Sequence, residues 1–136
     1  VDAKKDDIIT EDNQKKVIRM AKELAVKTKA VIVITGETDL VTDGETVYFI
    51  KNGVPEMARI TGCGCMLDGV IAGFIGANQG NILEATVTAV SAMGICGEYA
   101  RENAKGTGTL KVHLIDAMSN IDETWMERSN QIESRS

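Results

Sequence analysis

Residues 61–75 read Thr-Gly-Cys-Gly-Cys-Met-Leu-Asp-Gly-Val-Ile-Ala-Gly-Phe-Ile, and this stretch decides the fold. It begins as a glycine-rich turn and continues as an apolar helix. Glycine lets the backbone turn tightly and bring its amides close to a ligand. The first N–H groups of a helix have no partner within the helix, and the helix dipole places partial positive charge beside them. The stretch therefore predicts an anion-binding turn, most plausibly for a phosphate.

Two elements are predicted upstream of this turn. Residues 10–29 place apolar side chains three and four positions apart, which is typical of an amphipathic helix with Thr10 or Asn13 as its cap. Residues 30–35 are a mostly β-branched run, which is typical of a strand covered on both faces in a parallel sheet. A helix that leads into such a strand predicts an α/β layered fold.

A β-hairpin is predicted between this strand and the glycine-rich turn. Residues 39–42 and 46–50 are short β-rich runs. They are joined by Asp43-Gly44, a pair that favours the positive φ angles of a tight turn. The hairpin adds two strands to the sheet.

Three helices are predicted after the turn. The first covers about residues 65–78, the second about 81–103, and the last is centred on Leu114. The chain is polar from residue 127, so we expect residues 127–136 to form a flexible tail. Residues 1–136 are expected to form a single unit.

Composition excludes several classes of partner. The chain has 136 residues, 43% of them hydrophobic, with a net charge of -5 and 4% aromatic residues. It has no basic stripe, so we expect no nucleic-acid partner. No apolar run reaches about 18 residues, so we expect no membrane span. The chain opens at Val1 without an initiator methionine and shows no signal peptide, and we expect further residues to precede it in the natural protein.

The cysteines predict a reducing compartment rather than a metal centre. Cys63, Cys65 and Cys96 are an odd number without the spacing of a disulfide framework, which favours the cytoplasm. Cys-x-Cys is shorter than the spacing usual in structural zinc sites, and no second Cys/His pair follows. We therefore expect no protein-held metal and interpret the cysteines as small apolar side chains.

Four segments in order, residues 31–39, 41–44, 61–67 and 106–109, resemble the second half of the hydroxyethylthiazole kinase family, within the ribokinase-like superfamily. The resemblance covers nearly all of the chain. It implies a partial ribokinase-like α/β fold, the nucleotide-side half of a kinase domain, with strand–helix units and a hairpin followed by three C-terminal helices. It also implies transfer of the γ-phosphoryl group of ATP, with Mg²⁺, to the hydroxyl of 4-methyl-5-(2-hydroxyethyl)thiazole in thiamine salvage. Relatives act as homotrimers with active sites between subunits, which implies the same assembly here.

The resemblance also implies roles for single residues. Thr35 and Gly36 would contact ATP, and Gly62 would contribute backbone to the substrate site. Cys65 stands where most ribokinase-like enzymes carry a catalytic aspartate, and we expect it to orient the hydroxyl rather than to be indispensable. Phosphoryl transfer needs positioning and charge stabilisation more than a strong base, so the amides of Gly62, Cys63, Gly64 and Cys65 form the predicted anion hole.

The chain departs from the family pattern at two points. Asp68 stands where relatives commonly have serine or threonine, and it either stabilises the helix start or has taken a base role. The superfamily's Asn-x-x-Glu motif for Mg²⁺ lies upstream of the strand in relatives. The similar letters at 81–84 and 130–133 follow the turn, so we interpret them as chance and Asn81 as a helix cap.

Two alternatives remain open from the sequence. A ribokinase-like kinase for another small alcohol would keep the anion-binding turn and change the substrate pocket. A non-catalytic half domain would serve assembly or nucleotide binding alone.

Overall fold

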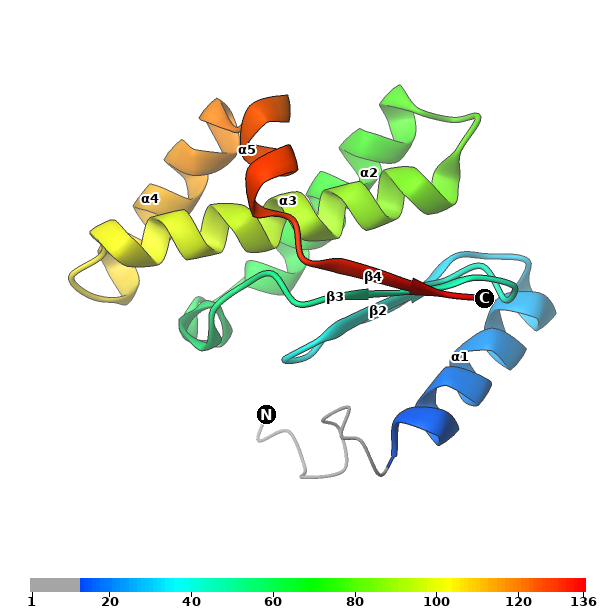
Figure 1. The fold of residues 1–136 in the computed structure, drawn as a ribbon. Helices are drawn as coiled ribbons and strands as arrows, with labels where there is room; N and C mark the ends of the chain where they lie inside the picture. Colours follow the sequence, from blue (N-terminus) through cyan, green and yellow to red (C-terminus); the bar gives the residue numbers. More distant parts are fainter. Residues whose placement is uncertain (1–12) are drawn as a thin grey trace.

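The computed structural model describes residues 13–136, and they form three layers (Figure 1). A sheet lies in the middle, helix α1 (Gln14–Thr28) covers one of its faces, and the remaining helices lie on the other. The α/β class predicted from the sequence is confirmed. Thr10, one of the two predicted caps of α1, lies outside the described residues, and Asn13 occupies the cap position.

The sheet contains four strands in the order β1-β2-β3-β4. They are β1 (Ile32–Ile34), β2 (Asp39–Thr42), β3 (Val47–Ile50) and β4 (Ile132–Arg135), and every neighbouring pair is antiparallel. The predicted parallel sheet is therefore wrong for the described residues. Only residues 35–38 separate β1 from β2, whereas a parallel crossover needs a dozen residues or more.

The strands that are covered on both faces are β2 and β3, not β1. Leu40 packs with Ala21 of α1, and the next residue, Val41, packs with Val87 and Val90 on the opposite face. β1 is half-buried along its length and lies at the edge of the sheet. A β-branched run favours a strand but does not say which strand lies inside the sheet, and this is why the sequence assigned the coverage to β1.

The predicted hairpin is confirmed, with a turn that differs in detail. Gly44 has a φ of 104°, but Asp43 does not share a positive φ. Instead, the Asp43 Oδ1 atom accepts hydrogen bonds from the amides of Glu45 and Thr46, at 2.9 and 3.0 Å. A Cβ at Gly44 would lie 2.7 Å from Val26 Cγ2, so glycine also permits close packing of the turn on α1.

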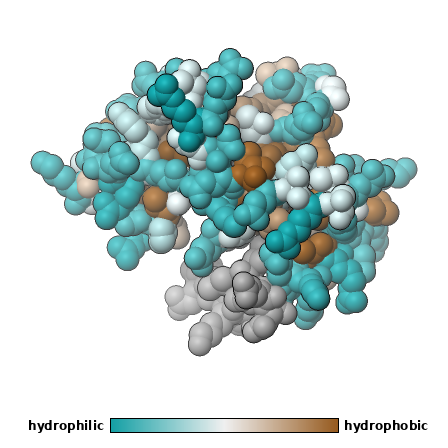
Figure 2. All heavy atoms as spheres, in the orientation of Figure 1, coloured by the Kyte–Doolittle hydropathy of each residue, from teal (hydrophilic) through white to brown (hydrophobic). Residues whose placement is uncertain are grey.

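The 3-10 helix η2 (Pro55–Arg59) follows the hairpin and precedes the glycine-rich turn. The three predicted helices are confirmed as α2 (Cys63–Ala77), α3 (Ile82–Asn103) and α4 (Thr107–Asn120). α3 is the central helix: it contributes thirteen buried residues and packs on the sheet as well as on α2 and α4. α2 has no fully buried residue despite its apolar composition, and Figure 2 shows apolar side chains at the surface over it.

The expectation of a flexible tail at 127–136 is wrong. The chain continues into α5 (Glu123–Ser129), capped by Asp122, and then into β4, which pairs with β3. The Lys51 side chain forms an ion pair with Glu133 across these two strands. The polarity that suggested a tail is that of an edge strand whose side chains are mostly exposed.

A buried asparagine joins β3, α3 and the C-terminal segment. The Asn52 Oδ1 atom accepts hydrogen bonds from Ser91 Oγ and the Gln131 amide, at 3.0 and 2.8 Å. Its Nδ2 atom donates to Glu98 Oε1 and the Ser129 carbonyl, at 3.1 and 2.8 Å. The side-chain amide thus uses both donors and accepts twice, which offsets the free-energy cost of burying it.

α3 approaches Asn52 closely because the residue of α3 that faces Asn52 is a glycine, Gly94. A Cβ at Gly94 would lie 2.6 Å from both the carbonyl carbon and the Cβ of Asn52. Backbone cannot move aside as the end of a flexible side chain can, so position 94 excludes a larger residue.

None of the helices in residues 13–136 combines the length and the hydrophobicity that a membrane span needs.

We predict that Gly94→Ala lowers the free energy of unfolding by about 2 kcal/mol, because the new methyl group overpacks against the Asn52 backbone. The matched control is Gly69→Ala on exposed α2, where a Cβ meets nothing within 4 Å. That variant is expected to gain about 1 kcal/mol from helix propensity. Urea denaturation measures both, and equal stabilities for the two variants would contradict the packing account.

Candidate functional site

The glycine-rich turn borders a cavity of about 860 Å³ between the sheet, η2 and the start of α2. One wall is the loop of residues 35–39, and another is the segment 51–55 that leaves β3. Cys63 and Gly64 of α2 close a third side, and α3 contributes uncharged residues at 90, 93 and 94. The loop that follows β1 and the start of α2 thereby face one cavity.

Four of the predicted site residues line this cavity. Thr35 and Gly36, predicted to contact ATP, share it with Cys63 and Gly64 of the predicted anion hole. The other two members, Gly62 and Cys65, flank this pair in sequence but do not line the cavity. The Cys65 side chain is exposed.

Gly62 gives the turn its shape. It precedes the first residue of α2 with a φ of 87°, in the left-handed region that favours glycine. Gly64 lies inside the first turn of α2, and a Cβ on either residue would meet nothing within 4 Å. Gly62 is therefore required by the backbone conformation, whereas Gly64 leaves open space beside its amide.

Three of the four predicted amides have no acceptor within the described residues. Cys63 donates its N–H to the Ile60 carbonyl at 3.2 Å, so this member of the predicted anion hole is already used. Met66 donates to the Gly62 carbonyl at 2.9 Å, as the first regular bond of the helix. The N–H groups of Gly62, Gly64 and Cys65 are left with neither a backbone nor a side-chain partner in this part of the chain. A helix start with open amides suits an anion.

The cysteines do not gather into a centre. Cys63, Cys65 and Cys96 are all free thiols. Burial raises the pKa of the Cys63 thiol, and it raises the pKa of Cys96, at the core of α3, to about 11. Residues 13–136 contain no group of three or more His, Cys, Asp or Glu side chains that could hold a metal ion.

Asp39 is a residue of the cavity that sequence reasoning missed. It is half-buried at the first position of β2, and its Oδ1 atom accepts a hydrogen bond of 2.8 Å from the Gly36 amide. Burial raises the pKa of Asp39 to about 6, and the Gly36 hydrogen bond opposes this rise. An Asx turn bonds backbone further along the chain, whereas Asp39 accepts from a residue before it, so turn chemistry did not indicate this bond.

The charged side chains of the cavity wall are Glu37, Asp39 and Lys51. Lys51 is already paired with Glu133 of β4. Within residues 13–136, the side chains of the cavity wall therefore supply no unpaired positive charge, and the groups that suit an anion there are backbone amides of the turn.

A second missed residue, Glu98 of α3, shapes the wall. Its Oε1 atom accepts hydrogen bonds from the Gly53 amide at 2.8 Å and from Asn52 Nδ2 at 3.1 Å. Gly53 has a φ of 123° and lines the cavity. These contacts depend on a helix 45 residues further along the chain, so no local pattern could indicate them.

The remaining motifs have structural roles. Asn81 caps α3, accepting from the Glu84 amide with its side chain, which confirms the expected cap. Asn130 lies at the end of α5 and donates to the Met126 carbonyl at 2.9 Å. Asp68 is exposed in the second turn of α2.

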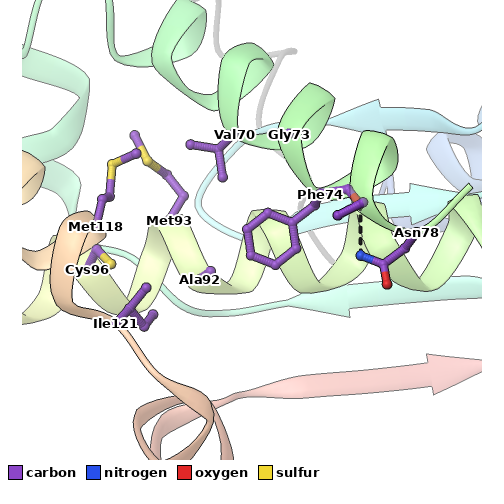
Figure 3. A pocket seen from close by; sticks show the side chains of 10 residues that line it. Val70, Gly73, Phe74, Asn78, Ala92, Met93, Cys96, Met118 and Ile121 are labelled. Atoms are coloured by element: carbon purple, nitrogen blue, oxygen red, sulfur yellow. Dashed lines mark hydrogen bonds between the residues drawn. The ribbon is translucent and has the colours of Figure 1, made fainter.

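A second cavity, of about 450 Å³, lies between α2, α3 and α4 (Figure 3). Phe74, Met93 and Met118 point into it, and its other lining residues are almost all apolar. Its one amide side chain, Asn78, donates to the Phe74 carbonyl at 2.9 Å. Without a charged group or an open amide, this cavity does not suit an anion.

The fold and the site together define an α/β chain in which a helix start with open amides lies beside a sheet loop. Comparison with known proteins gives the family. The model of the "Hydroxyethylthiazole kinase family" matches residues 3–124, so the chain belongs to the hydroxyethylthiazole kinase family.

Individual relatives of the chain carry the same family name. The chain is 42% identical to "Hydroxyethylthiazole kinase 1" of Clostridium botulinum over 134 residues, covering 98% of this chain and 49% of the relative. It is 39% identical to "Hydroxyethylthiazole kinase" of Clostridium acetobutylicum, covering 98% of this chain and 50% of the relative. The structure of the hydroxyethylthiazole kinase protein from Pyrococcus horikoshii matches with a TM-score of 0.85 and 27% identity, covering 93% of this chain and 49% of that one. The chain thus spans about half the length of these relatives.

The raised pKa of Asp39 predicts how stability changes with pH. Between the ordinary value of 3.8 and about 6, the folded chain holds a proton that the unfolded chain has lost, so stability falls as pH rises through this window. Asp39→Asn cannot ionise and can still accept from Gly36. Its stability advantage over the wild type is expected to be absent below pH 4, to grow up to about pH 6 and then to stay constant.

Urea denaturation at pH 3.5 to 8 measures this advantage. Asp43→Asn is the control with the opposite sign, because hydrogen bonds from the Thr46 and Glu45 amides lower the pKa of Asp43. Relative to the wild type, that variant is expected to lose stability as pH rises towards 3.8 and to keep a constant deficit above that value, so its denaturation series extends down to about pH 2.5. An Asp39→Asn advantage that shrinks with rising pH contradicts the assignment.

Proposed function

We propose that this chain carries the nucleotide side of a hydroxyethylthiazole kinase, which transfers the γ-phosphoryl group of ATP to the hydroxyl of 4-methyl-5-(2-hydroxyethyl)thiazole in thiamine salvage. One observation carries the proposal: Thr35 and Gly36 line the same cavity as the start of α2, whose Gly64 and Cys65 amides have no partner in the described residues. Family membership and the 42% identity to a hydroxyethylthiazole kinase support it.

In the proposed reaction, the residues of the turn act by position and charge. The Thr35–Gly36 loop binds the nucleotide, and the amides of Gly62, Gly64 and Cys65 face its terminal phosphoryl group. These amides are fixed before the reaction, so they stabilise the negative charge of the transition state without reorganising. The Cys63 amide takes no part, because it is bonded to Ile60.

Mg²⁺ is proposed to enter with the nucleotide. It usually keeps several waters and binds through substrate phosphates rather than in an all-protein cage. The described residues contain no cluster of ligands for it, which fits a metal carried by ATP. When bound, Mg²⁺ neutralises phosphate charge, and the amides of the turn complete the stabilisation.

Cys65 is proposed to orient the acceptor hydroxyl. It is exposed in the first turn of α2, beside the amides that face the phosphoryl group. A serine can form the same hydrogen bond, so Cys65→Ser is expected to lower the turnover rate by less than about tenfold and to leave ATP affinity unchanged, as measured by steady-state kinetics and calorimetry. Abolished turnover with normal binding would contradict this modest role.

Assembly as a homotrimer with active sites between subunits is also proposed. α2 is apolar yet has no fully buried residue, which supports its burial against another copy. The three free thiols support a reducing compartment such as the cytoplasm. Sedimentation velocity of the natural protein is expected to give a species of three times the chain mass, and a monomer at micromolar concentration would contradict this assembly.

A nucleotide-binding module without catalysis is the second candidate. It is favoured by the position of Gly62 and Cys65, which do not line the cavity. The two candidates differ in turnover and not in nucleotide binding.

The experiment that tests the proposal titrates this chain with the Mg²⁺ complex of a β,γ-imido analogue of ATP and then assays phosphorylation of the thiazole alcohol. Binding with turnover supports the kinase, and binding without turnover supports the module. Turnover only with a sugar or pyrimidine alcohol would indicate a related kinase. Absence of binding overturns the proposal.

Gly62→Ala is expected to weaken binding of the analogue at least tenfold, because alanine is strained at the positive φ of this position. Gly69→Ala is the matched control.

A further inference from the structure

The carboxyl groups of the proposed nucleotide cavity disfavour a negatively charged ligand. The described residues give its wall three charged side chains: Glu37 and Asp39 are acids, and Lys51 is paired with Glu133. A nucleotide polyphosphate brings several negative charges into the same space. A carboxylate that stays charged beside it weakens binding, more so where solvent is displaced.

The two acids differ in their freedom to move away. Glu37 is exposed and makes no hydrogen bond within the described residues, so solvent and salt screen its charge. Asp39 is half-buried, its backbone is paired with Ile50 of β3, and its Oδ1 atom is bonded to the Gly36 amide. Asp39 therefore stays in the wall when a ligand enters.

Protonation of Asp39 removes this repulsion and keeps the hydrogen bond between Asp39 and Gly36. A neutral carboxyl group still accepts the Gly36 hydrogen bond through one oxygen and carries the proton on the other. Apart from Glu37, no group that the described residues place around Asp39 competes for this proton. β1 is Ile32–Ile34, α3 contributes only uncharged residues to the cavity, and burial raises the pKa of the Cys63 thiol on α2, which keeps it neutral.

We propose that Asp39 is a positioning residue of the nucleotide site, whose carboxyl group holds the Gly36 loop in the cavity wall and takes up one proton when the polyphosphate binds. The inference rests on the proposed function. The proton comes from water or buffer and adds to Asp39 Oδ2, and no covalent bond to the nucleotide forms. Burial has already raised the pKa of Asp39 to about 6, so completing its protonation near neutral pH costs little.

Calorimetric titration with the Mg²⁺–imido analogue of ATP tests the inference between pH 6.5 and 8. If the bound form requires a protonated Asp39, wild-type affinity falls about tenfold for each unit of pH above 6.5. Asp39→Asn keeps the acceptor for Gly36 without a charge, so it is expected to bind more tightly than the wild type at pH 8, with little dependence on pH. Asp39→Ala lacks the acceptor and is expected to bind at least fivefold more weakly than Asp39→Asn at every pH.

Proton uptake is measured by repeating the titration at pH 7 in buffers of different ionisation enthalpy. The wild type is expected to take up about one proton more than Asp39→Asn, and the difference between the two cancels the titration of the nucleotide itself. Asp43→Asn is the matched control, an aspartate that accepts similar backbone hydrogen bonds in the hairpin turn, outside the cavity. It is expected to match the wild type in uptake and affinity.

The outcomes separate the inference from the function on which it rests. If the wild type binds no nucleotide at any pH, the proposed function fails and the inference falls with it. If the wild type binds but Asp39→Asn shows the same affinity, pH dependence and uptake, only the inference is overturned.

Discussion

The hydrogen bonds of the Asn52 side chain are the constraint on which the rest of the structure depends. They tie the end of β3 to α3 and to the segment that forms β4, and Gly94 lets α3 come close enough for them to form. The chain then leaves β3 through Gly53, held by Glu98, and proceeds to η2 and α2. The start of α2 and the loop after β1 line one cavity because the packing of α3 on Asn52 is fixed.

The sequence predicted what local physics determines. The glycine at 62 indicated a special backbone conformation and the start of α2, and the observed φ of 87° agrees. Apolar spacing predicted α3 and α4, and Asp43-Gly44 predicted the hairpin. Strand order, β4 and the exits from β3 were not predictable, because each depends on partners distant in the sequence. The mostly polar segment 132–135 resembles a tail until β3 is placed beside it.

The site was predicted only in part, because some of its contacts depend on residues that come together only in the folded chain. Thr35, Gly36, Cys63 and Gly64 do line one cavity, but the Cys63 amide is bonded to Ile60, a contact that only the three-dimensional turn reveals. Asp39 was missed because its sequence context is an ordinary turn, and its chemistry arises from burial by other elements. Within the described residues, the site thus combines open amides with carboxyl groups, and only the amides suit an anion.

We propose that the open amides at the start of α2 hold the terminal phosphate of a nucleotide. A crystal structure of the chain with the Mg²⁺–imido analogue of ATP would locate that phosphate. We expect it within about 3 Å of the Gly64 and Cys65 amide nitrogens, with the nucleotide against the Thr35–Gly36 loop. A nucleotide bound in the apolar cavity near Phe74, or one whose phosphates point away from α2, would contradict it.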